Sequence, residues 1–142
     1  MRRKILILTH GKFAEGIADS LRMISGIEEV SRISIAEDDS PEDVRSQISA
    51  FIASAEEDSD IIVLTDIQGG SSTQAAFPFL QTQQNLHLVT GLNLGLLLEI
   101  VLSTEENTAA GIEKAVENAK SSIVYLNKLL DKVVENDYVT EG

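Results

Sequence analysis

Short apolar runs between turn residues recur along the chain and predict four strands. The runs KILILT at 4–9, IIVLTD at 61–66 and LHLVT at 86–90 are almost wholly apolar, whereas VSRISI at 30–35 alternates apolar with polar residues. Runs of this length are typical of strands in a sheet. Because the alternating run has a more polar face, we expect it near an edge of the sheet.

Between the first two runs the apolar positions change to helical spacing. They recur every three or four residues from Lys12 up to Gly26, at Phe13, Ala14, Ile17, Ala18, Leu21 and Ile24. This spacing predicts an amphipathic helix that packs this stripe on the core, and Gly26 fits a helix stop.

Further segments predict the remaining helices. The residues at 39–43 combine a cap candidate, a proline and acidic residues, which is typical of a helix start. The turn GGSS at 69–72 leads into a short helix that Pro78 is expected to kink or shorten. Residues 91–102 start another helix, and Thr108 is expected to cap a last one that extends to about residue 120.

The end of the chain is ambiguous. Residues 121–134 place apolar side chains at helical spacing, but IVYL within them favours a strand, so both alternatives stay open. We find no internal repeat or linker. The sequence therefore predicts one domain over 1–142, with its core at about 3–135 and a polar tail at 136–142.

The alternation of strands and helices predicts the fold class. A β-α-β-α order forms an α/β fold, with an open, mostly parallel sheet and helices on both faces. We expect the common strand order 2-1-3-4, in which the order reverses between strands 1 and 3. Sheets of this kind bind ligands at that point, outside the carboxyl ends of the strands.

Charge narrows the classes of partner. The net charge is −12, from 23 acidic and 11 basic residues, and this argues against a nucleic acid, which calls for a basic face. It also argues against an anionic membrane surface. A phosphate group would need local hydrogen-bond donors, because the overall field repels anions.

The apolar runs and the lack of cysteine bear on location. The run at 94–102 is interrupted by Glu99 and is far shorter than the roughly 20 residues of a membrane helix. MRRKILIL at 1–8 opens like a signal peptide, but its apolar part is too short. No cysteine is present, which excludes disulfides and fits a reducing compartment. We expect a cytoplasmic protein without membrane insertion.

Polar residues with chemical potential follow the first and third strands. His10 ends the first run and Asp66 ends the third, so neighbouring strands would bring them to one edge of the sheet. Asp66 would accept a hydrogen bond from one ring nitrogen of His10 and leave the other as a nucleophile or base. Gly69, Gly70, Ser71 and Ser72 would lie beside them, where converging amides at a helix start bind phosphate.

Other residues occupy the same edge. Thr9, Gly11 and Lys12 flank His10, and Asn93 follows the fourth strand, so these four are candidates for the rim of the site or for partner contacts. Simpler interpretations stay open, because Lys12 also fits a solvated first-turn residue and Asn93 a helix cap.

Motifs for several other chemistries are absent from the sequence. It contains no GxxxxGK[ST], GxGxxG or GxSxG, which disfavours a P-loop nucleotidase, NAD binding and a serine hydrolase. His87 lies among apolar neighbours and is expected to be a structural strand residue. Two separated histidines without cysteine do not predict a zinc site. We expect neither a metal nor a cofactor.

Three stretches together resemble a known family. LTHGKFAEG at 8–16, LTDIQGGSSTQAA at 64–76 and VTGLNLGLLLE at 89–99 fall at the ends of strands 1, 3 and 4, and general similarity runs over about 3–125. In this order and spacing they resemble the IIA component of the mannose-fructose-sorbose family of the bacterial sugar phosphotransferase system.

The resemblance implies a cytoplasmic phosphocarrier. The histidine matched by His10 would take a phosphoryl group from phospho-HPr and pass it to a IIB component, which serves the membrane components IIC and IID. Asp66 would hold the ring, and the turn amides at Gly70 and Ser71 would receive the phosphoryl oxygens. The family is also dimeric, with a C-terminal antiparallel strand exchanged between subunits. That strand would fall at 121–126, which favours the strand alternative there.

The sequence departs from the family pattern after the glycines. Ser72 stands where proline is common, Thr73 where an apolar residue is common and Gln74 where asparagine is common; Gly95 likewise replaces a frequent proline. His10 and the aspartate remain, so the departure puts partner contacts and sugar class in doubt rather than phosphorylation.

Two other functions compete with the carrier. One is a regulatory module of the same type, phosphorylated at His10 to switch a transcription activator. The other is a phosphatase or mutase for a small metabolite, which would want more basic residues near the anion than Lys12 alone.

Overall fold

A computed structural model describes residues 2–131, in which strands and helices alternate as the pattern predicts. In chain order they are β1 (Arg3–His10), α1 (Phe13–Ser25), β2 (Ser31–Ile35), α2 (Pro41–Ser54), β3 (Asp60–Thr65), α3 (Ser71–Ala76), α4 (Phe79–Thr82), β4 (Leu86–Thr90), α5 (Leu94–Val101) and α6 (Thr108–Ser121).

The four strands form one parallel sheet in the order β2-β1-β3-β4. This confirms the predicted order and the edge position of β2. Leu8 of β1 pairs with Thr65, the last residue of β3, while His10 pairs with Ile35 of β2. β1 therefore extends two residues past the end of β3 and carries His10 to the level of the loop that follows β3.

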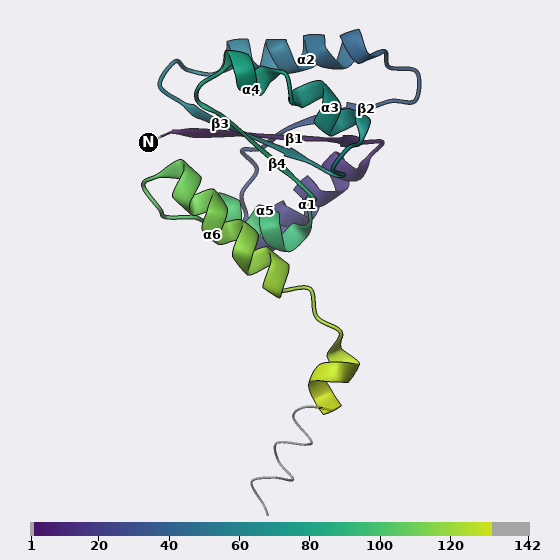
Figure 1. Cartoon of the computed structure of the whole chain (residues 1–142), viewed down its shortest axis with the longest axis vertical. Helices are drawn as coiled ribbons and strands as arrows, with labels where there is room; N and C mark the ends of the chain where they lie inside the picture. The colour runs from purple at the N-terminus through teal and green to yellow at the C-terminus, as the bar shows by residue number, and fades with distance from the viewer. Residues whose placement is uncertain (1, 132–142) are drawn as a thin grey trace, which may run out of the picture.

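Helices cover both faces of the sheet. In Figure 1, α2, α3 and α4 lie on one side of it, and α1, α5 and α6 lie on the other. Successive residues of β1 point to opposite faces, so Ile5 and Ile7 join the core under α1 and α5, and Leu6 and Leu8 join the core under α2. Fully burying such a side chain contributes about 1.5–3 kcal/mol each, which makes β1 a rigid support for His10.

The stripe predicted for α1 is partly wrong. Its buried residues are Ala14, Ile17, Ala18 and Leu21, whereas Phe13 is 45% exposed and Ile24 is 60% exposed. Phe13 and Ile24 lie roughly a quarter turn from the centre of the buried stripe, because each residue advances the helix by about 100°. Phe13 therefore does not pack on the core behind the site. Gly26 does end the helix, with φ 77° and its N–H on Arg22 O at 2.8 Å.

The predicted ends of the other helices are largely confirmed. Ser40 caps α2 through a reciprocal capping box with Asp43, and the helical segment at 71–82 breaks at Phe77 and Pro78 into α3 and α4. The cap predicted for α6 is wrong, because Asn107 caps this helix by accepting from Ala110 N at 2.9 Å. Thr108 is instead the first helical residue.

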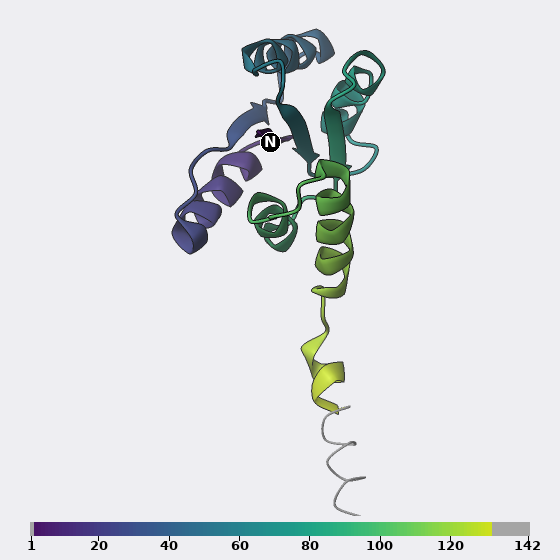
Figure 2. The ribbon, with the colours of Figure 1, turned by 90° about the vertical axis from the view of Figure 1, so that its left-hand side faces the viewer.

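The segment after α6 leads away from the body of the molecule (Figure 2). Residues 122–125 form neither helix nor strand, and a helical turn follows at 126–131. The strand expected at 121–126 is thus not formed within the single chain, because nothing beside it supplies the hydrogen bonds of a ladder. Exchange between subunits stays a prediction, and the predicted tail at 136–142 lies outside the described residues.

Among residues 2–131, no helix has both the length and the apolar content that crossing a bilayer requires.

Candidate active site at the carboxyl edge of the sheet

His10 stands at the carboxyl edge, held by the strand on one side and open on the other. Its side chain is 45% exposed. Gly11 follows with φ 55°, in the left-handed region that glycine adopts without strain, and its N–H donates to Ile35 O at 2.9 Å. The backbone therefore turns away directly after the histidine and leaves one side of the ring accessible.

The carboxylate of Asp66 accepts four hydrogen bonds, two on each oxygen. Oδ2 accepts from the His10 backbone N–H at 2.9 Å and lies 2.8 Å from Nδ1 of the His10 ring. Oδ1 accepts from Ile67 N–H at 3.1 Å and from the Ser72 hydroxyl at 2.6 Å. The predicted pairing of His10 with Asp66 is present, and the carboxylate plane is fixed from both sides.

These donors keep Asp66 ionised. Burial by itself would raise the pKa of this carboxyl, but hydrogen bonds from Ser72 and from the backbone and ring of His10, with the charge of His10, outweigh it and lower the pKa to about 2. An ionised carboxylate only accepts hydrogen bonds, so Nδ1 of His10 carries a proton toward Asp66. In the neutral ring, Nε2 then bears the free electron pair.

Ser71 contacts this second nitrogen. Its Oγ lies 2.7 Å from Nε2 of His10, so with the ring in this tautomer the hydroxyl donates to Nε2. The sequence predicted Ser71 beside a phosphate but gave no signal that its hydroxyl meets Nε2 of His10. The meeting depends on how β1 and the start of α3 are placed across the edge.

The glycines let the turn approach the ring closely. Gly69 has φ 80°, and a Cβ added at Gly70 would lie 3.3 Å from His10 Cε1 and 3.3 Å from Ile67 O. Only glycine fits at Gly70 without displacing one of these neighbours. Beyond it, α3 begins, and the N–H groups of its first turn have no acceptor within the helix.

The three residues that depart from the family pattern all make hydrogen bonds to Asp66 or to the turn before α3. Ser72 is fully buried and bonds Asp66. The Thr73 hydroxyl donates to Ile67 O at 2.8 Å, and the Gln74 side chain donates to Gly69 O at 3.0 Å. The prediction that Ser72 binds phosphate is thereby narrowed to its backbone N–H, because its hydroxyl is engaged with the carboxylate.

A cluster of threonine hydroxyls behind the turn escaped the sequence analysis. Thr73 Oγ1 lies 2.7 Å from Thr65 Oγ1 and 3.2 Å from Thr90 Oγ1, so it joins the ends of β3 and β4. The sequence signal that could have predicted this cluster is the threonine that ends each of these two strands.

The remaining rim residues take structural positions or lie in the open. Thr9 is fully buried, and its hydroxyl accepts from Ala14 N–H at 2.8 Å, which caps the first turn of α1. Asn93 caps α5 by accepting from Leu96 N–H at 2.9 Å. Lys12 is exposed at the start of α1. Gly11 and Lys12, which directly follow His10 in the chain, are both exposed.

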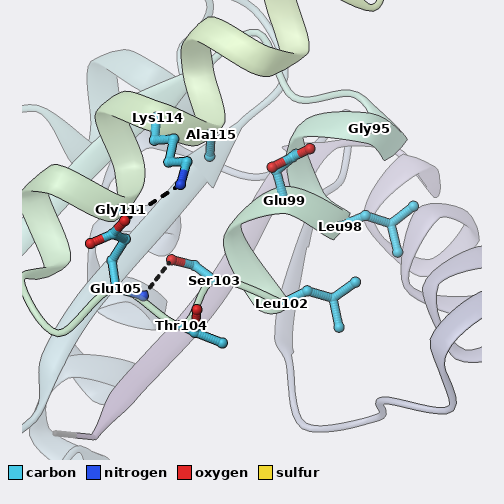
Figure 3. A pocket seen from close by; sticks show the side chains of 10 residues that line it. All are labelled: Gly95, Leu98, Glu99, Leu102, Ser103, Thr104, Glu105, Gly111, Lys114 and Ala115. Carbon is cyan, nitrogen blue, oxygen red and sulfur yellow. Dashed lines mark hydrogen bonds and ion pairs between the residues drawn. The ribbon is translucent and has the colours of Figure 1, made fainter.

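A separate hollow lies between α5 and α6 (Figure 3). Lys114 and Glu105 pair in its lining, with Nζ 3.5 Å from the carboxylate. The carbonyl of Glu105 accepts from Arg3 at the start of β1, so this part of the hollow lies at the opposite end of that strand from His10. It does not belong to the histidine site.

Comparison with known proteins finds similarity over the part of the chain that contains these site residues. A family model described as the PTS system fructose IIA component matches residues 4–120. The fructose-specific EIIA component of the PTS system of Bacillus subtilis (strain 168) is 30% identical over 107 residues, which cover 74% of this chain and 72% of the relative.

Solved structures agree with this similarity. The phosphotransferase system component EIIA from Streptococcus agalactiae superposes with a TM-score of 0.80 at 30% identity, over 89% of this chain and 98% of that one. The mannose/sorbose-specific IIA subunit from Enterococcus faecalis gives a TM-score of 0.81 at 25% identity, over 87% and 94%.

Proposed function

This chain belongs to the family of the fructose IIA component of the sugar phosphotransferase system, and we propose that His10 is the residue on which it carries a phosphoryl group. The observation that supports this most directly is the arrangement of the ring, with Nδ1 on Asp66 at 2.8 Å and Nε2 on Ser71 at 2.7 Å. Asp66 holds one nitrogen protonated, and the other nitrogen faces a donor that a phosphoryl group can displace.

The transfer step needs only the ring and its supports. The electron pair of Nε2 attacks the phosphorus atom of a donor phosphohistidine, the new N–P bond forms, and the old N–P bond leaves with its electrons on the donor ring. The proton on Nδ1 stays between the ring and Asp66, which stabilises the positive charge that the ring gains. Delivery to an acceptor histidine reverses these roles.

Positioning and charge stabilisation carry most of phosphoryl transfer. The Ser71 hydroxyl, the N–H groups at the first turn of α3 and the N–H of Gly69 would contact the phosphoryl oxygens, whereas the N–H of Gly70 already donates to Ile67 O at 3.1 Å. They are uncharged donors, which suits a protein whose net charge of −12 repels anions at long range. The exposed side of His10 leaves room for a protein donor and a protein acceptor in turn.

We propose HPr as the donor and a IIB component as the acceptor, through which the phosphoryl group reaches the membrane components IIC and IID during sugar uptake. The carrier would act in the cytoplasm as one domain spanning 1–142 and as a homodimer. These assignments rest on the resemblance of the three edge stretches and on family membership.

Labelling tests the proposal. The protein is incubated with phosphoenolpyruvate, enzyme I and HPr, and we expect an acid-labile, base-stable phosphate on the chain. His10→Ala should lose the label, whereas His87→Ala should keep it, because His87 lies within β4. Equal labelling of the two variants, or no label on the wild-type chain, would overturn the assignment.

A further inference from the structure

The Ser72 hydroxyl contacts the oxygen of Asp66 that His10 does not use. We propose that Ser72 is a positioning residue, which fixes the plane of the Asp66 carboxylate and through it the tautomer and orientation of the His10 ring. The inference deepens the proposed function, since it concerns the same transfer. It concerns a residue of this chain that stands where proline is common in the family.

The contact is built into the interior of the site. Ser72 is fully buried, and its Oγ lies 2.6 Å from Asp66 Oδ1. The Asp66 side chain is only 11% exposed, so water cannot readily replace a lost donor. A buried carboxylate that loses a hydrogen bond from a neutral donor is left poorly satisfied, which is costly for a charged group.

Ser72 is the only side-chain donor on Oδ1 among the hydrogen bonds of residues 2–131. The other donor on Oδ1 is the N–H of Ile67, the next residue in the chain, and it lies at 3.1 Å. Rotation about the last torsion of an aspartate is soft. A donor from α3 therefore sets the angle of the carboxylate, and with it the direction from Oδ2 to Nδ1 of His10.

Two adjacent residues of α3 then hold the ring at both ends. Ser71 lies on Nε2, while Ser72 acts on Nδ1 through Asp66. Thr73 and Gln74 tie the same turn to Ile67 O and Gly69 O. A displacement of α3 would therefore change the contacts of both ring nitrogens together. It would couple the position of Nε2 to the protonation of Nδ1.

A purely structural role makes a different prediction. If the hydrogen bond of the Ser72 hydroxyl only offset the cost of burying that hydroxyl, its removal would lower stability. The titration of Asp66 and the tautomer of His10 would not change. The two roles are separated by comparing Ser72→Ala with Ser59→Ala. Ser59 is also a buried serine, at 4% exposure, and it precedes β3 at the end opposite Asp66.

Nuclear magnetic resonance gives the first readout, without any partner protein. In Ser72→Ala we expect the pKa of Asp66, followed by its carboxyl ¹³C shift, to rise from about 2 toward the ordinary 3.8. The ¹⁵N shifts of His10 should change from one tautomer, protonated at Nδ1, to a mixture of two. Ser59→Ala should leave both signals as in the wild type.

Kinetics gives the second readout. In transfer from phospho-HPr, Ser72→Ala should lower kcat about tenfold, the loss expected when one hydrogen bond to a charged group is removed, with KM within about twofold. Because Ser72 acts through Asp66, adding Ser72→Ala to the Asp66→Asn variant should lower kcat little further. An equal loss of kcat in both backgrounds would place the effect outside Asp66.

The proposal is overturned if the Asp66 titration and the His10 tautomer of Ser72→Ala match those of the wild type, or if Ser59→Ala changes them equally. Failure of the proposed function is distinct from this result. If the wild-type chain takes no phosphoryl group, the carrier assignment fails, while the resonance measurements still decide whether Ser72 positions Asp66 and His10.

Discussion

The chemistry of the site depends on a few atoms around one imidazole. His10 is placed by β1, its Nδ1 is fixed by Asp66, and its Nε2 meets Ser71. The residue-scale predictions concern Asp66, which contacts Nδ1, and Gly70, where an added Cβ would lie 3.3 Å from the ring.

The first concerns the pH dependence of stability. Asp66 has its pKa lowered to about 2 from 3.8, so between these values the folded protein binds fewer protons than the unfolded chain. This contribution to the free energy of unfolding is fully present above about pH 4 and is lost as the pH falls toward 2. Between pH 5 and 2, we expect the wild type to lose about 1–2 kcal/mol more stability than Asp66→Asn.

Urea unfolding of both proteins at several pH values in this range measures the difference. The other acidic residues titrate in both proteins, so the comparison isolates Asp66. If the free energy of unfolding fell equally with pH in both proteins, the lowered pKa of Asp66 would be contradicted.

The second prediction concerns Gly70. Because an added Cβ would lie 3.3 Å from His10 Cε1, Gly70→Ala should displace the ring or the turn by a few tenths of an ångström. Its φ of −76° suits alanine, so the fold should persist. If the displacement costs about 1 kcal/mol in the transition state, phosphorylation slows about fivefold.

The His10 ring signals and the labelling rate measure this effect. Gly16→Ala serves as a control for the ring signals, because a Cβ there meets nothing within 4 Å. Unshifted ring signals and an unchanged labelling rate in Gly70→Ala would show that the turn accommodates the methyl group.

At the scale of elements, local signals place the helix starts. The α2 capping box joins Ser40 to Asp43 N at 3.1 Å and Asp43 to Ser40 N at 3.0 Å, ahead of a buried stripe at Val44, Ile48 and Phe51. Such a motif acts within four residues, so it is visible in the sequence. The caps of α1 and α6 are less visible, because Thr9 lies inside a strand and Asn107 stands beside an equally plausible Thr108.

The cap of α2 is open to measurement. Ser40→Ala should lower the free energy of unfolding by about 1 kcal/mol, because the N–H of Asp43 loses its acceptor. Ser46→Ala is a matched change on an exposed position of the same helix, and alanine's higher helix propensity should leave it neutral or slightly stabilising. Equal losses in the two variants would mean that the box contributes nothing.

At the scale of the whole molecule, an apolar segment extends from the body into solvent. Ile123 is 80% exposed, Tyr125 is 70% exposed and Leu126 is 67% exposed. Apolar side chains gathered in this way mark an interaction surface. The proposed homodimer would cover them, with strand β4 at the open edge of the sheet available for pairing.

Sedimentation tests the assembly. The wild type should sediment as a dimer of 15.4 kDa chains, and replacing Ile123 and Tyr125 together by aspartate should give monomers. The fold of the monomer should persist, because neither side chain belongs to either core cluster. A wild-type monomer at micromolar concentration would contradict the prediction.

The sequence by itself determined the order of elements, the parallel sheet and the residues at its carboxyl edge. These depend on hydrophobic period, chain order and handed crossovers, all of which are written along the chain. Only the tertiary structure decided which hydrogen bonds form at this edge. Ser71 contacts Nε2 of His10, Ser72 donates to Asp66, and the Thr9 hydroxyl accepts from the first turn of α1. Such contacts join segments more than fifty residues apart or depend on local rotation, and hydrogen bonds are sensitive to shifts of a fraction of an ångström.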